Sequence, residues 1–224
     1  YKKDLEPHGW EIRLLHRPST TVQEYPKRHP KVAELSKPAF SDWRRLHLLR
    51  DHGGCWLDAS IFVDDPQALD ALIDLAKYSR GVEVVGYHNR LIQTNDTYPV
   101  IESALLMAVP NSKFIAVWLE EFMKATDMGF EAYNDELPSR GVDTQKILTH
   151  QGLGVYLTVQ TTAQAAMMRR GTDAVRTIEV HYGMYALRRI TNADPKKMKA
   201  ALQNRELRKL AGITKLTSFE RSLF

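Results

Sequence analysis

Cysteine is almost absent from this chain of 224 residues, and the single copy, Cys55, can form neither an intramolecular disulfide nor a multi-cysteine zinc site. A reducing compartment is the simpler expectation for such a composition, so we predict a cytoplasmic location. No apolar run approaches the ~20 residues that cross a bilayer, and the start of the chain lacks the layout of a signal peptide. We therefore expect a soluble protein without a transmembrane segment.

A strong charge of one sign is also lacking. The chain has 31 lysine and arginine residues against 27 acidic ones, a net charge of +4, and no long basic block. Its aromatic residues follow core periodicity and are not interleaved with the basic ones, which disfavours a nucleic-acid partner. The modest excess by itself suits an anionic small ligand as well as it suits nucleic acid. A non-catalytic basic α/β module that binds a ligand or nucleic acid remains the alternative.

Strand and helix signals alternate along most of the chain. The predicted strands are 10–15, 55–62, 83–87, 155–159 and 177–180, and the predicted helices are 42–51, 67–78, 114–125, 143–150 and 195–211. Residues 100–109 fit either a strand or a short helix. Such alternation is typical of an α/β sandwich with a largely parallel sheet.

The length suits a single domain over 1–224, with 195–224 as a basic helical tail. The chain opens at Tyr1 with no methionine, and a strand at 10–15 already resembles the middle of a domain. We therefore expect that an N-terminal strand has been truncated.

One stretch stands out: Ser41 can cap helix 42–51, Gly53-Gly54 can end it, and Asp58 lies within the apolar run that follows. Burying an unpaired acid costs several kcal/mol, so an aspartate within an apolar run must have either a partner or a function. Ligands of open α/β sheets bind beyond the carboxyl ends of strands, which makes Asp58 a candidate ligand-binding residue. The alternative is that Asp58 caps a helix or pairs with a core arginine.

The stretch SDWRRLHLLRDHGGCWLDASIF, residues 41–62, resembles the central motif of GT-A-fold glycosyltransferases with a DXD sugar-binding signature. It is most similar to the capsular polysaccharide synthesis proteins, and the large clostridial glucosylating toxins share the layout. A second segment, PVIESALLMAVPNSKFIAVWLEEF at 99–122, is similar to the acceptor-side segment of the capsular proteins. The residues in register with the first motif are Ser41, Asp42, Arg45, Leu49, Gly53, Gly54, Trp56, Leu57 and Asp58.

The resemblance implies a GT-A-like single domain that transfers a hexosyl or deoxyhexosyl group from a nucleotide sugar, first of all a UDP-sugar, to a glycan or polysaccharide acceptor with retention. It makes Asp42 a ligand of sugar hydroxyls, Arg45 a contact to the sugar or its phosphate, and Asp58 the first DXD acid. Positive charge is needed because the departing diphosphate becomes more negative as the glycosidic bond breaks. Without the resemblance, Asp42 and Arg45 would be an ordinary ion pair on a helix surface.

The motif departs from the DXD pattern at Ser60, where a hydroxyl replaces the second acid, as it often does in the capsular proteins that the stretch resembles. The implied metal ligands are Asp58, Ser60 and His181, for Mn²⁺ or Mg²⁺, but a neutral ligand weakens the affinity for such ions, so metal dependence stays open. His181 could equally be a partly buried histidine. The resemblance places Arg188 and Arg189 on the diphosphate, and with Arg45 they would form the clamp of a metal-free enzyme.

Three other acids have two interpretations each. Asp64 and Asp65 could replace the missing metal ligand, although the Pro66 that follows favours the start of a helix. Glu102 is either an acceptor-side catalytic carboxylate, able to act as a general base in an inverting mechanism, or a surface acid.

A phosphatase of the haloacid-dehalogenase type is a further alternative function. It would need a second acid at residue 60, so the sequence Asp58-Ala59-Ser60 supplies only its nucleophile.

Overall fold

The computed structural model describes residues 2–15 and 29–224. Its main sheet has four strands in the order β1-β4-β3-β5. These strands are β1 (Gly54–Leu57), β3 (Val84–His88), β4 (Ile101–Ala108) and β5 (Val175–Glu179). Strand β4 is antiparallel to both of its neighbours, and only β3 and β5 pair in parallel. The fold is therefore mixed α/β, and the prediction of a largely parallel sheet is wrong because β4 lies reversed between β1 and β3.

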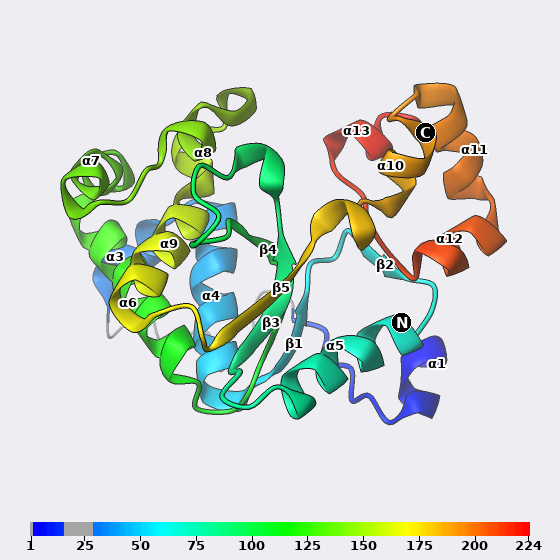
Figure 1. Cartoon of the computed structure of the whole chain (residues 1–224), viewed down its shortest axis with the longest axis horizontal. Coiled ribbons are helices and arrows are strands. Elements are labelled where there is room, and N and C mark those ends of the chain that lie inside the picture. Colours follow the sequence, from blue (N-terminus) through cyan, green and yellow to red (C-terminus); the bar gives the residue numbers. More distant parts are fainter. Residues whose placement is uncertain (1, 16–28) are drawn as a thin grey trace.

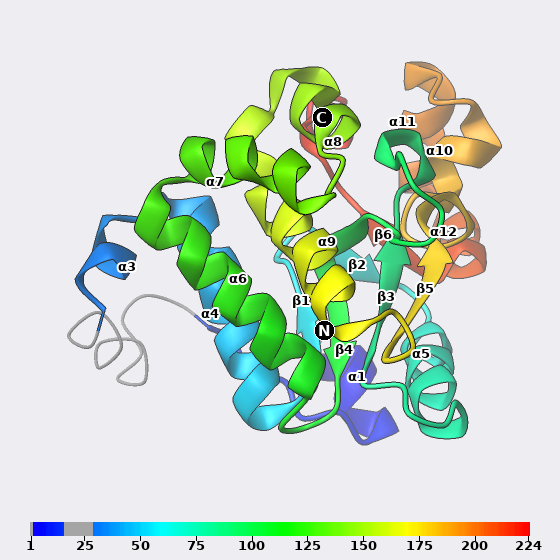
Figure 2. The same ribbon diagram turned by 60° about the vertical axis from the view of Figure 1, so that its left-hand side comes forward.

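Helices cover both faces of this sheet (Figure 1). One face carries α4 (Lys37–His52), α6 (Lys113–Met128) and α9 (Thr158–Arg170), which lie side by side in Figure 2. Trp43 and Trp118 belong to the apolar cluster on this side. The other face carries α5 (Gln67–Tyr78), and the cluster there includes Leu72 and Leu105. The smaller helices are α1 (Lys2–Leu5), α3 (Pro30–Glu34), α7 (Phe130–Glu136) and α8 (Gln145–Thr149).

A second, two-stranded sheet pairs a strand near the end of the chain with the strand that follows Asp58. Strand β2 (Ile61–Val63) pairs antiparallel with β6 (Ile213–Lys215), and Ile61 lies opposite Lys215. The segment predicted as a helical tail thus also contains a strand. Around it lie α10 (Ala186–Thr191), α11 (Pro195–Gln203), α12 (Arg205–Ala211) and α13 (Ser218–Arg221), gathered at the upper right of Figure 1.

The helix of the motif begins earlier than predicted, and Ser41 lies inside α4. Ser36 is its N-cap and accepts a hydrogen bond from the Ala39 amide, and Pro38 fits the first turn because its missing N–H would have no partner there. The helix stops where predicted. Gly53 has a φ of 65°, and a Cβ there would lie 2.5 Å from the Pro110 nitrogen, so only glycine fits.

The apolar run 55–62 is not one strand but two, joined by a turn at 58–60. The amide of Asp58 donates to the Ala104 carbonyl at 2.9 Å, and the Ile61 amide donates to the Asp58 carbonyl at 2.9 Å. The first contact ends the pairing of β1 with β4, and the second closes the turn. Asp58 therefore lies just past the carboxyl end of β1 and not within a buried strand.

Residues 155–159, predicted as a strand from their β-branched content, form a 3-10 turn and the start of α9. Tertiary packing decides this, because α9 is buried from Thr158 to Met167 between α6 and the sheet. Trp118 Nε1 donates to the Val159 carbonyl at 3.0 Å, and Gln164 Nε2 donates to the Tyr98 carbonyl at 2.6 Å. A polar helix can be buried here because several of its polar groups have partners, although among the described residues Gln160 Oε1 has none.

Two further predictions need correction. Residues 10–15 form neither a strand nor a helix, and the helix predicted over 195–211 is two helices, divided at Asn204. The predicted helix 67–78 is confirmed, as are the strands at 83–87 and 177–180 and the helix at 114–125, each with small shifts at its ends. Residues 101–108 form a strand. Among the described residues, no helix is both long and apolar enough to cross a membrane.

Candidate functional site

Polar side chains gather at one edge of the main sheet, where β1, β3 and β5 end. Asp58 follows β1, Asn89 follows β3, and His181 lies just beyond β5. Glu102 lies at the same edge, because it stands opposite Tyr87 near the end of β3. The three strands point in one direction although β4 is reversed, so their carboxyl ends still meet where α/β sheets bind ligands.

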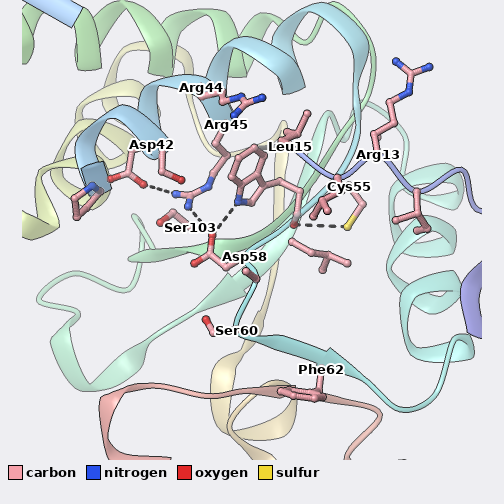
Figure 3. A pocket seen from close by; sticks show the side chains of 18 of the residues that line it. Arg13, Leu15, Asp42, Arg44, Arg45, Cys55, Asp58, Ser60, Phe62 and Ser103 are labelled. Atoms are coloured by element: carbon pink, nitrogen blue, oxygen red, sulfur yellow. Dashed lines mark hydrogen bonds and ion pairs between the residues drawn. The ribbon is translucent and has the colours of Figure 1, made fainter. Parts of the chain in front are cut away.

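Arg45 joins two carboxylates that come from different elements (Figure 3). Asp42 and Arg45 lie one turn apart on α4, and Arg45 Nη1 donates to Asp42 Oδ1. The second nitrogen, Nη2, donates to Asp58 Oδ1 at 2.8 Å. The side chains of Arg45 and Asp42 are only 4% and 13% exposed. They therefore form a buried network with Asp58 and not the surface ion pair that was the alternative.

Two more donors account for the burial of Asp58. Trp56 Nε1 donates to Oδ1 at 2.9 Å, and Lys215 Nζ donates to Oδ2 at 2.8 Å. Burial by itself raises the pKa of Asp58, but the charges of Arg45 and Lys215 and the hydrogen bonds to the carboxylate outweigh it and hold the pKa below its ordinary value. Asp58 is therefore an ionised carboxylate with a partner on each oxygen and room for a further donor on Oδ2.

Asp42 has the opposite electrostatic environment. It shares the single guanidinium of Arg45 with Asp58. The pKa of Asp42 is raised to about 6. Burial is the largest cause, the charge of Arg45 partly offsets it, and the negative charge of Asp58 adds to the increase. Two neighbouring carboxylates with pKa values on opposite sides of the ordinary value are typical of functional sites.

A cleft of about 920 Å³ opens beside this network and is large enough for a nucleotide-sized ligand. Asp42, Asp58 and Ser60 contribute to its wall, and the extended segment 10–15 forms another side. Two half-exposed aromatic rings, Phe62 and Tyr156, also line it. Burial and the negative charges of Asp42 and Asp58 raise the pKa of the Tyr156 phenol, so this ring lies within electrostatic reach of both acids.

The predicted metal ligands do not form a donor set that fits a divalent cation. Lys215 Nζ lies 2.8 Å from Asp58 Oδ2 and 2.8 Å from Ser60 Oγ, between the two groups that would have to share the ion. His181 Nδ1 is hydrogen-bonded to Glu179 Oε1 at 2.8 Å. Within residues 2–15 and 29–224, no group of three or more histidine, cysteine, aspartate and glutamate side chains could hold a metal. The cation stays a prediction, and this geometry does not favour it.

The two arginines predicted to bind diphosphate have protein partners. Arg188 pairs with Glu220, with Nη2 2.8 Å from Oε2, and its guanidinium stacks on the Tyr185 ring at 4.6 Å. Arg189 is exposed and stacks on Tyr182 at 4.2 Å. Arg188 thus links α10 to α13, and the roles of both arginines in ligand binding stay predictions.

Glu102 lies on strand β4, so it is not the helix-surface acid that was one interpretation. Asn89 Nδ2 donates to Glu102 Oε1 at 3.0 Å. Burial raises the pKa of Glu102, while Asn89 and the charges of Lys215, His150 and Arg188 lower it by less. The carboxyl group therefore holds a proton more readily than an exposed glutamate does.

Asp64 and Asp65 serve neighbouring helices. Asp65 Oδ1 accepts the Gln67 amide at 3.1 Å at the start of α5, as the helix-start interpretation predicts. Asp64 accepts from Arg208 Nε at 3.0 Å and so ties α12 to the end of β2.

Three residues of the site were missed in the sequence. Trp56 belongs to the motif, but no pattern predicts a role for its ring nitrogen; Tyr156 falls in the predicted strand 155–159, and nothing in the sequence points to Lys215. The Trp56 hydrogen bond joins residues two apart and could have been suspected from spacing. Lys215 could not, because 157 positions separate it from Asp58 and no sequence pattern links them.

A comparison of the sequence with protein-family models found a match to one family. Residues 20–123 match the model of the family described as capsular polysaccharide synthesis protein. No curated protein and no solved structure matches significantly. The matched part contains Asp42, Arg45, Asp58 and Glu102, while Lys215 lies outside it. The match supports the family that the motif at 41–62 resembles, over this part of the chain.

Proposed function

We propose that this chain is a glycosyltransferase that moves a sugar from a nucleoside-diphosphate sugar, first of all a UDP-sugar, to a glycan or polysaccharide acceptor. The observation that carries the proposal is the Asp42–Arg45–Asp58 network on the wall of a cleft of about 920 Å³. The network lies within residues 20–123, which are similar to capsular polysaccharide synthesis proteins. A role in polysaccharide synthesis agrees with that similarity.

The residues of the cleft suggest how the donor is held. The carboxylates of Asp42 and Asp58 would accept hydrogen bonds from sugar hydroxyls, and charge-assisted bonds of this kind are strong. Arg45 is too enclosed to contact a phosphate directly, so we assign it as a positioning residue that fixes both carboxylates. Phe62 and Tyr156 offer flat apolar surfaces for the base or the sugar ring.

In the proposed reaction, the bond between the anomeric carbon and the donor's β-phosphate oxygen breaks, and its electron pair stays on that oxygen. A new bond forms between the anomeric carbon and an acceptor hydroxyl oxygen. With retention of configuration, the released phosphate oxygen takes the hydroxyl proton. Glu102 is then an acceptor-side group, and it would become the general base only if transfer inverts the configuration.

Calorimetric titration with UDP-, GDP-, CDP-, ADP- and dTDP-sugars tests the proposal. One of these donors should bind the wild type, and at a hundred times its Kd it should stabilise the fold by about 2.7 kcal/mol. Asp58→Asn should lose this binding. Asp64→Asn is the matched control, because Asp64 is also a partly buried aspartate paired with a cation but does not line the cleft.

Binding of DNA or RNA with no binding of any nucleotide sugar would contradict the proposal and favour the non-catalytic module. Equal binding by the wild type and folded Asp58→Asn would remove Asp58 from the donor site and return it to a structural role.

A further inference from the structure

The most unusual feature of the site is a lysine where an ion would be expected. In a two-acid motif, residues 58 and 60 would both offer carboxylates to a shared cation. Here residue 60 is a serine, and the ammonium group of Lys215 lies 2.8 Å from Asp58 Oδ2 and 2.8 Å from Ser60 Oγ. A hydroxyl suits this arrangement, because an ammonium group needs only hydrogen-bond acceptors and not a second negative charge.

We propose that Lys215 is the built-in cation of this site, taking the place of a divalent metal, and that the nucleotide diphosphate binds there without metal. The inference rests on the proposed function, since it concerns the charge that faces the donor's diphosphate. It adds a residue outside the part of the chain that matches the family model.

The fold holds Lys215 firmly in this place. Lys215 is the last residue of β6 and stands opposite Ile61 of β2. The amide of the next residue, Leu216, donates to the Ser60 carbonyl at 2.8 Å. The Lys215 side chain is only 13% exposed, so little conformational freedom is left to lose when a ligand binds.

The occupancy of Asp58 argues against a metal beside Lys215. Its Oδ1 already accepts from Arg45 and Trp56, and its Oδ2 accepts from Lys215. Mg²⁺ or Ca²⁺ would need oxygen ligands at about 2.0–2.6 Å, which here means displacing the ammonium group. A divalent ion would also be repelled by two fixed positive charges, Arg45 and Lys215.

Lys215 still has capacity for a ligand. An ammonium group has three N–H donors, and in the described part of the chain Lys215 gives two of them, to Asp58 and Ser60. The third would donate to a phosphate oxygen of a diphosphate seated beside Asp58 and Ser60, which both line the cleft. As the donor's glycosidic bond breaks, this fixed charge would stabilise the electron pair left on the phosphate oxygen without any metal.

The test measures the binding of UDP, GDP, CDP, ADP and dTDP, without any sugar, to the full chain by calorimetry in EDTA and in MnCl₂. The wild type should bind one of them in EDTA, and MnCl₂ should not tighten this binding. Lys215→Met keeps most of the side-chain stem and removes the charge, so the binding in EDTA should weaken at least about tenfold. Lys215→Arg should keep most of the wild-type nucleotide affinity in EDTA, because it keeps the positive charge. Lys209→Met, an exposed lysine of α12, is the matched control and should match the wild type.

A second measurement needs no nucleotide. Electron paramagnetic resonance of added Mn²⁺ should show no binding to the wild type. The double variant Lys215→Met/Ser60→Asp restores two acids and removes the competing charge, so it should gain an Mn²⁺ site. Ser60→Asp alone should not gain an Mn²⁺ site, because the new carboxylate would pair with Lys215.

The results separate the two proposals. Nucleotide binding by the wild type only in MnCl₂, or unchanged binding by Lys215→Met in EDTA, would overturn the role of Lys215 and leave the glycosyltransferase proposal standing. Binding of no nucleotide under any condition would overturn both.

Discussion

Replacing Asp42 by asparagine should remove a large part of the pH dependence of folding stability. The pKa of Asp42 is raised from 3.8 to about 6, mainly by burial. Between these values the folded protein holds a proton that the unfolded chain has released. The stability contributed by protonated Asp42 is therefore complete below about pH 4 and is lost as the pH rises through about 6. A shift of about two pKa units corresponds to about 3 kcal/mol.

Asparagine resembles the protonated acid at every pH. The free energy of unfolding of Asp42→Asn minus that of the wild type should therefore rise by about 3 kcal/mol between pH 3 and pH 8. Urea unfolding followed by circular dichroism at several pH values measures both curves, and the subtraction removes the groups that titrate in both proteins. A stabilised variant that no longer binds the donor would be a case of stability traded for function.

A flat difference curve would refute this reasoning, and so would one that falls as the pH rises. Either result would mean that the ion pair with Arg45 outweighs the burial of Asp42. Asp42 would then have an ordinary or lowered pKa, and the two carboxylates of the site would not differ as described.

Two further predictions concern the elements that hold this edge of the sheet. Gly183→Ala should destabilise the fold by about 1–3 kcal/mol, because a Cβ there would lie 2.0 Å from Tyr87 Cε1 in the core, and a chemical denaturation curve close to that of the wild type would contradict this. Arg188→Met should cost about 3–5 kcal/mol, because it leaves Glu220, whose side chain is 2% exposed, without its ion-pair partner. Adding Glu220→Gln should recover much of that loss, and nucleotide binding by Arg188→Met below its melting temperature should match the wild type. A large loss of binding with little loss of stability would instead place Arg188 on the diphosphate.

Much of the local structure follows from the sequence alone. The spacing of Asp42 and Arg45 puts them one turn apart on a helix, and Gly53 ends that helix because glycine adopts its positive φ without strain. The alternation of helix and strand signals predicts the mixed α/β class. These features depend on residues a few positions apart, so local periodicity and backbone preference encode them.

Tertiary contacts decided the rest. Strand β4 enters the sheet in reverse, and α9 starts at residues with strand propensity because α6 and the sheet bury it and Trp118 bonds its Val159 carbonyl. The apolar run around Asp58 splits into two strands because β1 pairs with β4 and β2 with β6. That second pairing carries Lys215 across 157 positions to Asp58. A contact of such length leaves no local pattern, because only the packing of the whole fold brings the two charges together.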